Sequence, residues 1–128
     1  MTREAFEHSV ADALASIPRH LRDAMKNVAI VVEDEPSRAL LREMDIQAPE
    51  TLFGLYQGTP LTERSWTFGN QLPDRILLFQ GPHERDTRSH TDLVGAIAET
   101  LIHEIGHHFG LSEDAIEAIE AQYWRGAV

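Results

Sequence analysis

The stretch HEIGHHFGLSED, residues 103 to 114, contains polar residues at helical spacing, followed directly by Gly110, which is typical of a helix end. Successive helical residues lie about 100° apart, which places His103 and His107 one turn apart on one face. An apolar stripe occupies the opposite face and consists of Val94, Ala98, Leu101, Ile105 and Phe109. We therefore predict a helix from about Asp92 to Phe109, with one side in the core and two imidazoles facing a cleft.

Capping residues stand at both ends of this helix. Thr91 is the expected N-cap. Gly110 tolerates the left-handed conformation that ends many helices, and the apolar Leu111 follows it. Ser112 then caps a last helix, whose apolar positions are Ile116, Ile119 and Tyr123.

His103, Glu104 and His107 together predict a zinc site. Two imidazoles one helical turn apart can both reach one Zn²⁺ ion at about 2.0–2.1 Å. Glu104 stands beside the pair, where its carboxylate can take a proton from a zinc-bound water of lowered pKa. The pattern favours metal-assisted hydrolysis with Glu104 as the general base.

The third zinc ligand is expected after the glycine turn. A residue about three positions beyond Gly110 can swing back toward the metal, and carboxylate oxygens are suitable ligands. Glu113 is the first candidate, Asp114 the second and Glu117 the third. These acids could instead complement the dipole of the last helix.

The other histidines carry no such motif. His108 lies at the edge of the apolar stripe, and we predict a partly buried structural histidine there. Surface positions are expected for the rest, namely His8, His20, His83 and His90.

Further helices and strands complete the expected domain. A first helix capped by Thr2 and ended by Pro18 carries an apolar face of Phe6, Val10, Leu14 and Ile17. Residues 27–34 read as a buried strand. A second strand is expected from Arg75 to Gln80, closed by a turn at Gly81–Pro82. Residues 44–74 read mostly as loop, with a candidate strand in residues 51–58. We predict one α+β domain spanning residues 1–128.

Composition narrows the function classes. The chain has 128 residues, no cysteine and a net charge of −10. This charge disfavours partners such as nucleic acid or anionic membrane, and no apolar run approaches the about 20 residues of a membrane span. The absence of cysteine and a charged N-terminal stretch predict a cytoplasmic protein.

At the quoted motif the sequence resembles the zincin metallopeptidases, with their H-E-x-x-H-x-x-G-x-x-(H or D) signature. It is most similar to the small bacterial mini-zincins. Three further segments resemble segments found in that family, namely IVVEDEP (residues 30–36), GLYQGTPLTERS (54–65) and LPDRILLFQGP (72–82). The resemblance implies a minimal zincin-like fold, Zn²⁺ held by His103 and His107, catalysis by Glu104 and an acidic third ligand at position 113. The family usually has aspartate there, whereas this chain has Glu113.

The resemblance also implies a way of binding substrate. In zincins an edge strand above the active-site helix pairs with extended peptide, and we expect the strand Arg75–Gln80 to take that place. Thr62 to Ser65 could tie down the long loop or line the rim of the cleft. The aromatic and apolar residues Phe53, Leu55, Tyr56 and Trp66 could form either an edge of the core or a homodimer surface.

The sequence supports two functions. The first is a zinc-dependent metallopeptidase acting on peptide or protein. The alternative is a zinc-binding domain that binds peptide or protein without cleaving it.

Overall fold

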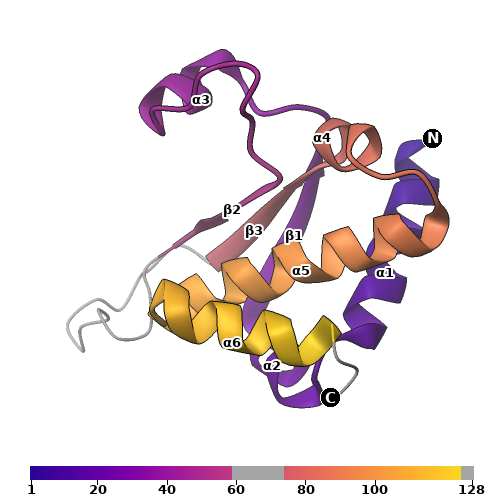
Figure 1. Ribbon diagram of the computed structural model, residues 1–128, viewed down its shortest axis with the longest axis vertical. Coiled ribbons are helices and arrows are strands. Elements are labelled where there is room, and N and C mark those ends of the chain that lie inside the picture. The colour runs from indigo at the N-terminus through magenta and orange to yellow at the C-terminus, as the bar shows by residue number, and fades with distance from the viewer. Residues whose placement is uncertain (59–73, 125–128) are drawn as a thin grey trace.

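The computed structural model describes residues 1–58 and 74–124 and shows helices packed around a small sheet (Figure 1). In chain order the elements are α1 (Arg3–Ser16), α2 (Arg19–Ala24), η1 (Met25–Asn27), β1 (Val28–Glu33), α3 (Arg38–Glu43), β2 (Gly54–Gln57), β3 (Asp74–Phe79), α4 (Gln80–Arg85), α5 (His90–His108) and α6 (Glu113–Trp124). The predicted α+β class is confirmed.

The sheet is mixed and has the strand order β1-β3-β2. β3 pairs in parallel with β1, where Val28 lies opposite Asp74, and antiparallel with β2, where Tyr56 lies opposite Ile76. The prediction that this strand forms a substrate-binding edge is therefore wrong, because β3 is the central strand. Among the strands that the structure describes, β1 and β2 form the edges. β1 is accordingly half-buried, not buried as its apolar sequence suggested.

Helices α1 and α5 lie side by side and supply most of the core on their side of the sheet (Figure 1). Phe6 of α1 and Leu101 of α5 are fully buried in one cluster with Ile76 of β3. The apolar faces predicted for both helices are confirmed, and Leu14 and Phe109 pack at the edge of the cluster. None of the helices formed by residues 1–58 and 74–124 has the length and apolar character needed to cross a bilayer.

Hydrogen bonds at the ends of α5 and α6 show where the capping predictions hold. The N-cap of α5 is Ser89, whose hydroxyl accepts the Asp92 N–H at 3.1 Å, so the prediction of Thr91 is wrong by two residues. Gly110 does adopt a positive φ of 71°. The N–H groups of Gly110 and Leu111 bond back to the last turn of α5 at 3.0 and 2.9 Å, which completes a Schellman motif. Ser112 caps α6 as expected.

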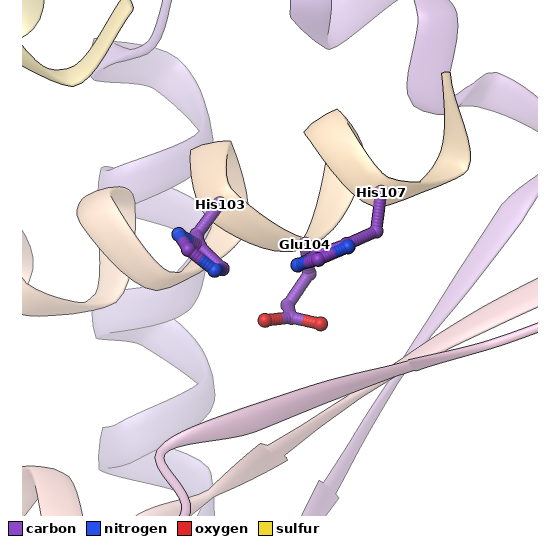
Figure 2. Close-up of side chains that lie close together, drawn as sticks. All are labelled: His103, Glu104 and His107. Atoms are coloured by element: carbon purple, nitrogen blue, oxygen red, sulfur yellow. The ribbon is translucent and has the colours of Figure 1, made fainter. Parts of the chain in front are cut away.

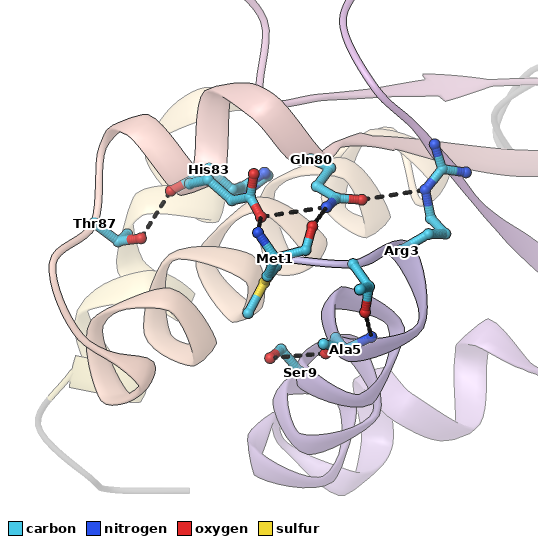
Figure 3. Close-up of polar contacts among 9 residues, drawn as sticks. Met1, Arg3, Ala5, Ser9, Gln80, His83 and Thr87 are labelled. Atoms are coloured by element: carbon cyan, nitrogen blue, oxygen red, sulfur yellow. Dashed lines mark hydrogen bonds and ion pairs between the residues drawn. The ribbon is translucent and has the colours of Figure 1, made fainter.

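α4 replaces the turn that was predicted at Gly81–Pro82. Proline is tolerated in the first turn of a helix because its missing N–H would have no partner there, so this dipeptide fits a helix start as well as a turn. Hydrogen bonds join α4 to the N-terminal residues of the chain (Figure 3). The Gln80 amide donates to the Met1 carbonyl at 3.0 Å, and its oxygen accepts from Arg3 Nε at 3.1 Å.

His83 of α4 is fully buried, so its predicted surface position is wrong. Its Nδ1 lies 2.8 Å from the Phe79 carbonyl oxygen, and its Nε2 lies 2.9 Å from Thr100 Oγ1 on α5. Burial lowers the pKa of this imidazole. His83 is therefore a structural link between α4 and α5, which the sequence did not reveal because α4 was not expected.

The approach of α6 to α5 depends on Gly106. A Cβ atom at this position would lie 2.5 Å from Cγ1 and 2.7 Å from Cδ1 of Ile116, a fully buried residue of α6. Such separations are too short for carbon atoms, so a side chain at position 106 would push the two helices apart.

We expect Gly106→Ala to destabilise the protein by about 1–2 kcal/mol, because overpacking outweighs the gain of about 1 kcal/mol in helix propensity. Urea denaturation measures this change. The matched variant Ile116→Ala makes room for the new methyl group, so the double variant should be more stable than the sum of the two single changes predicts. Strict additivity would contradict the proposed contact.

Candidate metal centre

Both imidazoles of the motif extend from the same side of α5 (Figure 2). The ring centroids of His103 and His107 lie 5.0 Å apart. Their side chains are 36% and 41% exposed, so the rings are held by the helix but remain accessible. Ligand atoms of His103, Glu104 and His107 all lie within 4.8 Å of one another, which is close enough for one ion.

Glu113, at the start of α6, faces both rings. One carboxylate oxygen lies 3.6 Å from His103 Nε2, and the other lies 3.6 Å from His107 Nε2. Two donors bound at about 2.1 Å to a tetrahedral metal stand roughly 3.4 Å apart. Each of these two contacts is close to that separation, and each involves a different oxygen of Glu113. Among the ion pairs of the described residues, none joins Asp114 to either histidine.

Glu104 lies beside the two histidines, and its carboxylate is bound by the backbone of β2. It is 9% exposed, and its Oε1 accepts the backbone N–H of Tyr56 at 2.7 Å. Figure 2 shows its carboxylate extending from α5 toward the strands. Burial raises the pKa of Glu104, while the Tyr56 hydrogen bond and the two histidines act in the opposite sense. One oxygen of this carboxylate is thus engaged by the backbone, and the carboxylate itself lies beside the two imidazoles.

The contact between Glu104 and β2 depends on Gly54. A Cβ atom there would lie 2.6 Å from Thr100 Cγ2 on α5 and 3.0 Å from the Leu77 carbonyl oxygen on β3. Glycine thus lets β2 approach α5 closely enough for the Tyr56 N–H to reach the carboxylate.

A cavity of about 510 Å³ opens next to these residues. Its lining includes the acidic side chains of Asp86, Glu99, Glu104, Glu113, Glu117 and Glu120. Burial, with a smaller contribution from Glu120, raises the pKa of Glu99. So many carboxylates around one cavity repel each other, and a divalent cation would relieve that repulsion.

Two contacts at this centre were not predicted from the sequence. Glu120 of α6 lies 3.1 Å from His103 Nδ1, and the Tyr56 backbone binds Glu104. Glu120 could have been found from its spacing, since residues seven apart lie on the same face of a helix as Glu113. The Tyr56 contact could not, because it depends on which strand lies against α5.

The remaining histidines lie outside this centre. His108 is 6% exposed, and its Nδ1 lies 2.8 Å from the buried Asp74 carboxylate, which confirms a structural role. The predicted exposure of His8, His20 and His90 is also confirmed. The Thr62 to Ser65 segment and Trp66 lie outside the described residues, so the proposed cleft rim and homodimer surface stay predictions.

Comparisons with known proteins agree with this description. A family model described as zincin-like metallopeptidase matches residues 25–123. A solved structure of a conserved hypothetical protein from T. thermophilus has a similar fold, with a TM-score of 0.56 and 23% sequence identity. The similarity covers 85% of this chain and 94% of that one, and at this identity it supports the fold alone. No curated protein matches the chain.

The buried carboxylate of Glu104 predicts a pH effect on the metal-free protein. Because its pKa is raised on folding, the folded state binds more protons than the unfolded state between the two pKa values, and stability falls as the pH rises through that window. Glu104→Gln removes the ionisation and keeps an oxygen for the Tyr56 N–H. With chelator present, we expect the variant to be more stable than wild type at about pH 8 and close to it at about pH 4. Urea denaturation at both pH values checks this, and equal stability at the higher pH would contradict it.

Proposed function

The chain belongs to the zincin-like metallopeptidase family, and from this premise we propose that it is a zinc-dependent peptidase. The observation that carries the proposal is the position of Glu113, whose two oxygens each lie 3.6 Å from the Nε2 atom of one motif histidine. Glu104 stands beside them as the general base. We also propose that residues 1–128 form one domain, which acts on peptide or protein and binds neither nucleic acid nor membrane.

His103, His107 and Glu113 would hold the metal in this proposal. Two imidazoles and one carboxylate are a donor set that zinc accepts in catalytic sites, and they leave one position open. When bound, zinc supplies a Lewis acid for the substrate carbonyl and lowers the pKa of a water molecule. Asp114 remains the alternative third ligand, although it contacts neither histidine among the described ion pairs.

Glu104 would carry the proton during hydrolysis. Its Oε1 is engaged by the Tyr56 N–H, which leaves Oε2 to accept a proton from the attacking water. The same oxygen can then give that proton to the leaving amine, so the carboxylate ends each cycle unchanged. The raised pKa favours this role, because a base whose pKa lies nearer the working pH also serves as an acid.

Substrate would bind along β2. This strand is an edge of the described sheet, and the backbone N–H of Tyr56 points from it toward Glu104. An extended peptide pairing with the edge would place its carbonyl near the histidines without requiring a particular side chain. The central position of β3 removes that strand from this role.

A zinc-binding domain that binds peptide without cleaving it is the second candidate. The 62% exposure of the Glu113 side chain favours it, because a ligand that few neighbouring groups hold in place binds a metal less firmly than a buried one. Digestion of a peptide library with and without chelator separates the two functions. Cleavage that chelator abolishes and added zinc restores supports the peptidase, and zinc binding without cleavage supports the alternative.

The assignment of Glu113 can be tested against its neighbour. We expect Glu113→Ala to weaken zinc binding at least about tenfold, because it removes one of three protein ligands. Asp114→Ala removes the same charge from the next residue and should change the affinity only slightly. Competition with a chromogenic chelator measures both affinities. If the Asp114 variant lost more affinity than the Glu113 variant, Asp114 would be the ligand.

The role of Glu104 predicts a separation of binding from catalysis. Glu104→Gln should keep one zinc per chain and reduce peptide hydrolysis by about 10²–10⁴-fold, the usual contribution of a general base. Zinc content is measured on protein purified without a metal-binding tag, and turnover is measured on the same sample. Undiminished turnover by the zinc-loaded variant would remove Glu104 from the mechanism.

A further inference from the structure

We infer that Glu120 is a positioning residue, which holds the His103 ring with Nδ1 protonated so that the Nε2 lone pair faces the candidate metal position. Nothing in the motif points to Glu120, since it lies 17 residues beyond His103 on another helix. The consequence for zinc affinity rests on the proposed function, whereas the state of the ring does not.

The hydrogen bond between the two side chains fixes the tautomer. Glu120 Oε1 lies 3.1 Å from His103 Nδ1. An ionised carboxylate can only accept a hydrogen bond, so Nδ1 must be the donor. In a neutral imidazole the second nitrogen then carries a lone pair and no proton. That nitrogen is Nε2, the atom that lies 3.6 Å from the Glu113 carboxylate.

Burial makes this bond more effective than a surface ion pair. The Glu120 side chain is 15% exposed, whereas that of Glu113 is 62% exposed. Lower exposure reduces solvent screening and restricts the rotamers of Glu120, so the ring of His103 is held in one orientation. Both acids project from one face of α6, so a single helix supplies the candidate ligand and the residue that orients its partner.

The two motif histidines differ in this respect. Among the described residues, no hydrogen bond engages Nδ1 of His107, and its Nε2 faces the exposed Glu113 carboxylate at 3.6 Å. Removing Glu120 should consequently affect one ring and leave the other unchanged. This asymmetry distinguishes positioning from a general loss of negative charge around the cavity.

Zinc affinity of three variants gives the first test. Glu120→Ala removes the acceptor and should weaken zinc binding by about 10–100-fold, the usual effect of losing such a partner. Glu120→Gln keeps an oxygen that can accept from Nδ1, so its affinity should lie between those of wild type and the alanine variant. Asp86→Asn removes a charge from the same cavity lining at a residue that is not a candidate ligand, and should change the affinity by at most about threefold. Equal losses in Asp86→Asn and Glu120→Gln would overturn the inference.

Nitrogen NMR of the histidine rings in metal-free protein gives the second test. Wild type should show a protonated Nδ1 at His103, and Glu120→Ala should shift that ring toward a mixture of tautomers. His83 is an internal reference, because its Nδ1 faces the Phe79 carbonyl oxygen and should stay protonated in every variant that folds. A His103 tautomer that does not respond to Glu120→Ala would overturn the inference. If wild type showed the expected tautomer but bound no zinc, the positioning role would stand and the proposed peptidase would fall.

Discussion

The close approach of α5 and α6 is the constraint that creates the candidate centre. Gly106 lets Ile116 pack directly against α5, and the left-handed Gly110 reverses the chain between the two helices. These two glycines bring the acidic face of α6 over the histidine face of α5. Glu113 then meets both imidazoles, and Glu120 reaches the far side of one ring. A wider helix spacing would separate the carboxylates from the rings even if every side chain were kept.

A second close approach brings the sheet to the same centre. Gly54 allows β2 to lie against α5, and the Tyr56 N–H then binds the carboxylate of Glu104. This arrangement buries an acid and raises its pKa, which opposes folding at neutral pH. Under the proposed function, the same shift would serve a group that accepts and releases protons. The other carboxylates that line the cavity repel one another, which also opposes folding. Metal binding would offset both effects, so affinity for the ion and stability of the fold are expected to be coupled.

The sequence predicted where the residues of the candidate centre lie better than it predicted the surrounding sheet. Helical spacing and the glycine turn are local features, and they sufficed to place His103, Glu104 and His107 on one helix with Glu113 after a bend. Strand order is not local. Apolar content suggested that β1 would be buried and gave no sign that β3 would be central, because pairing partners depend on the whole fold. The predicted surface position of His83 was wrong for a related reason. Its burial follows from α4, a helix that was not expected because Gly81–Pro82 was read as a turn. Helical periodicity could have placed Glu120 on the same face of α6 as Glu113. Its contact with His103 could not be predicted, because that contact depends on how α6 packs against α5.

A crystal structure of the protein soaked with zinc would show whether the two helices share one ion. We expect one ion bound to Nε2 of His103, Nε2 of His107 and a carboxylate oxygen of Glu113, with Glu104 outside the coordination sphere and Glu120 still on Nδ1 of His103. An ion held by other residues, or no ion at this position in crystals soaked at saturating zinc, would contradict the proposed centre.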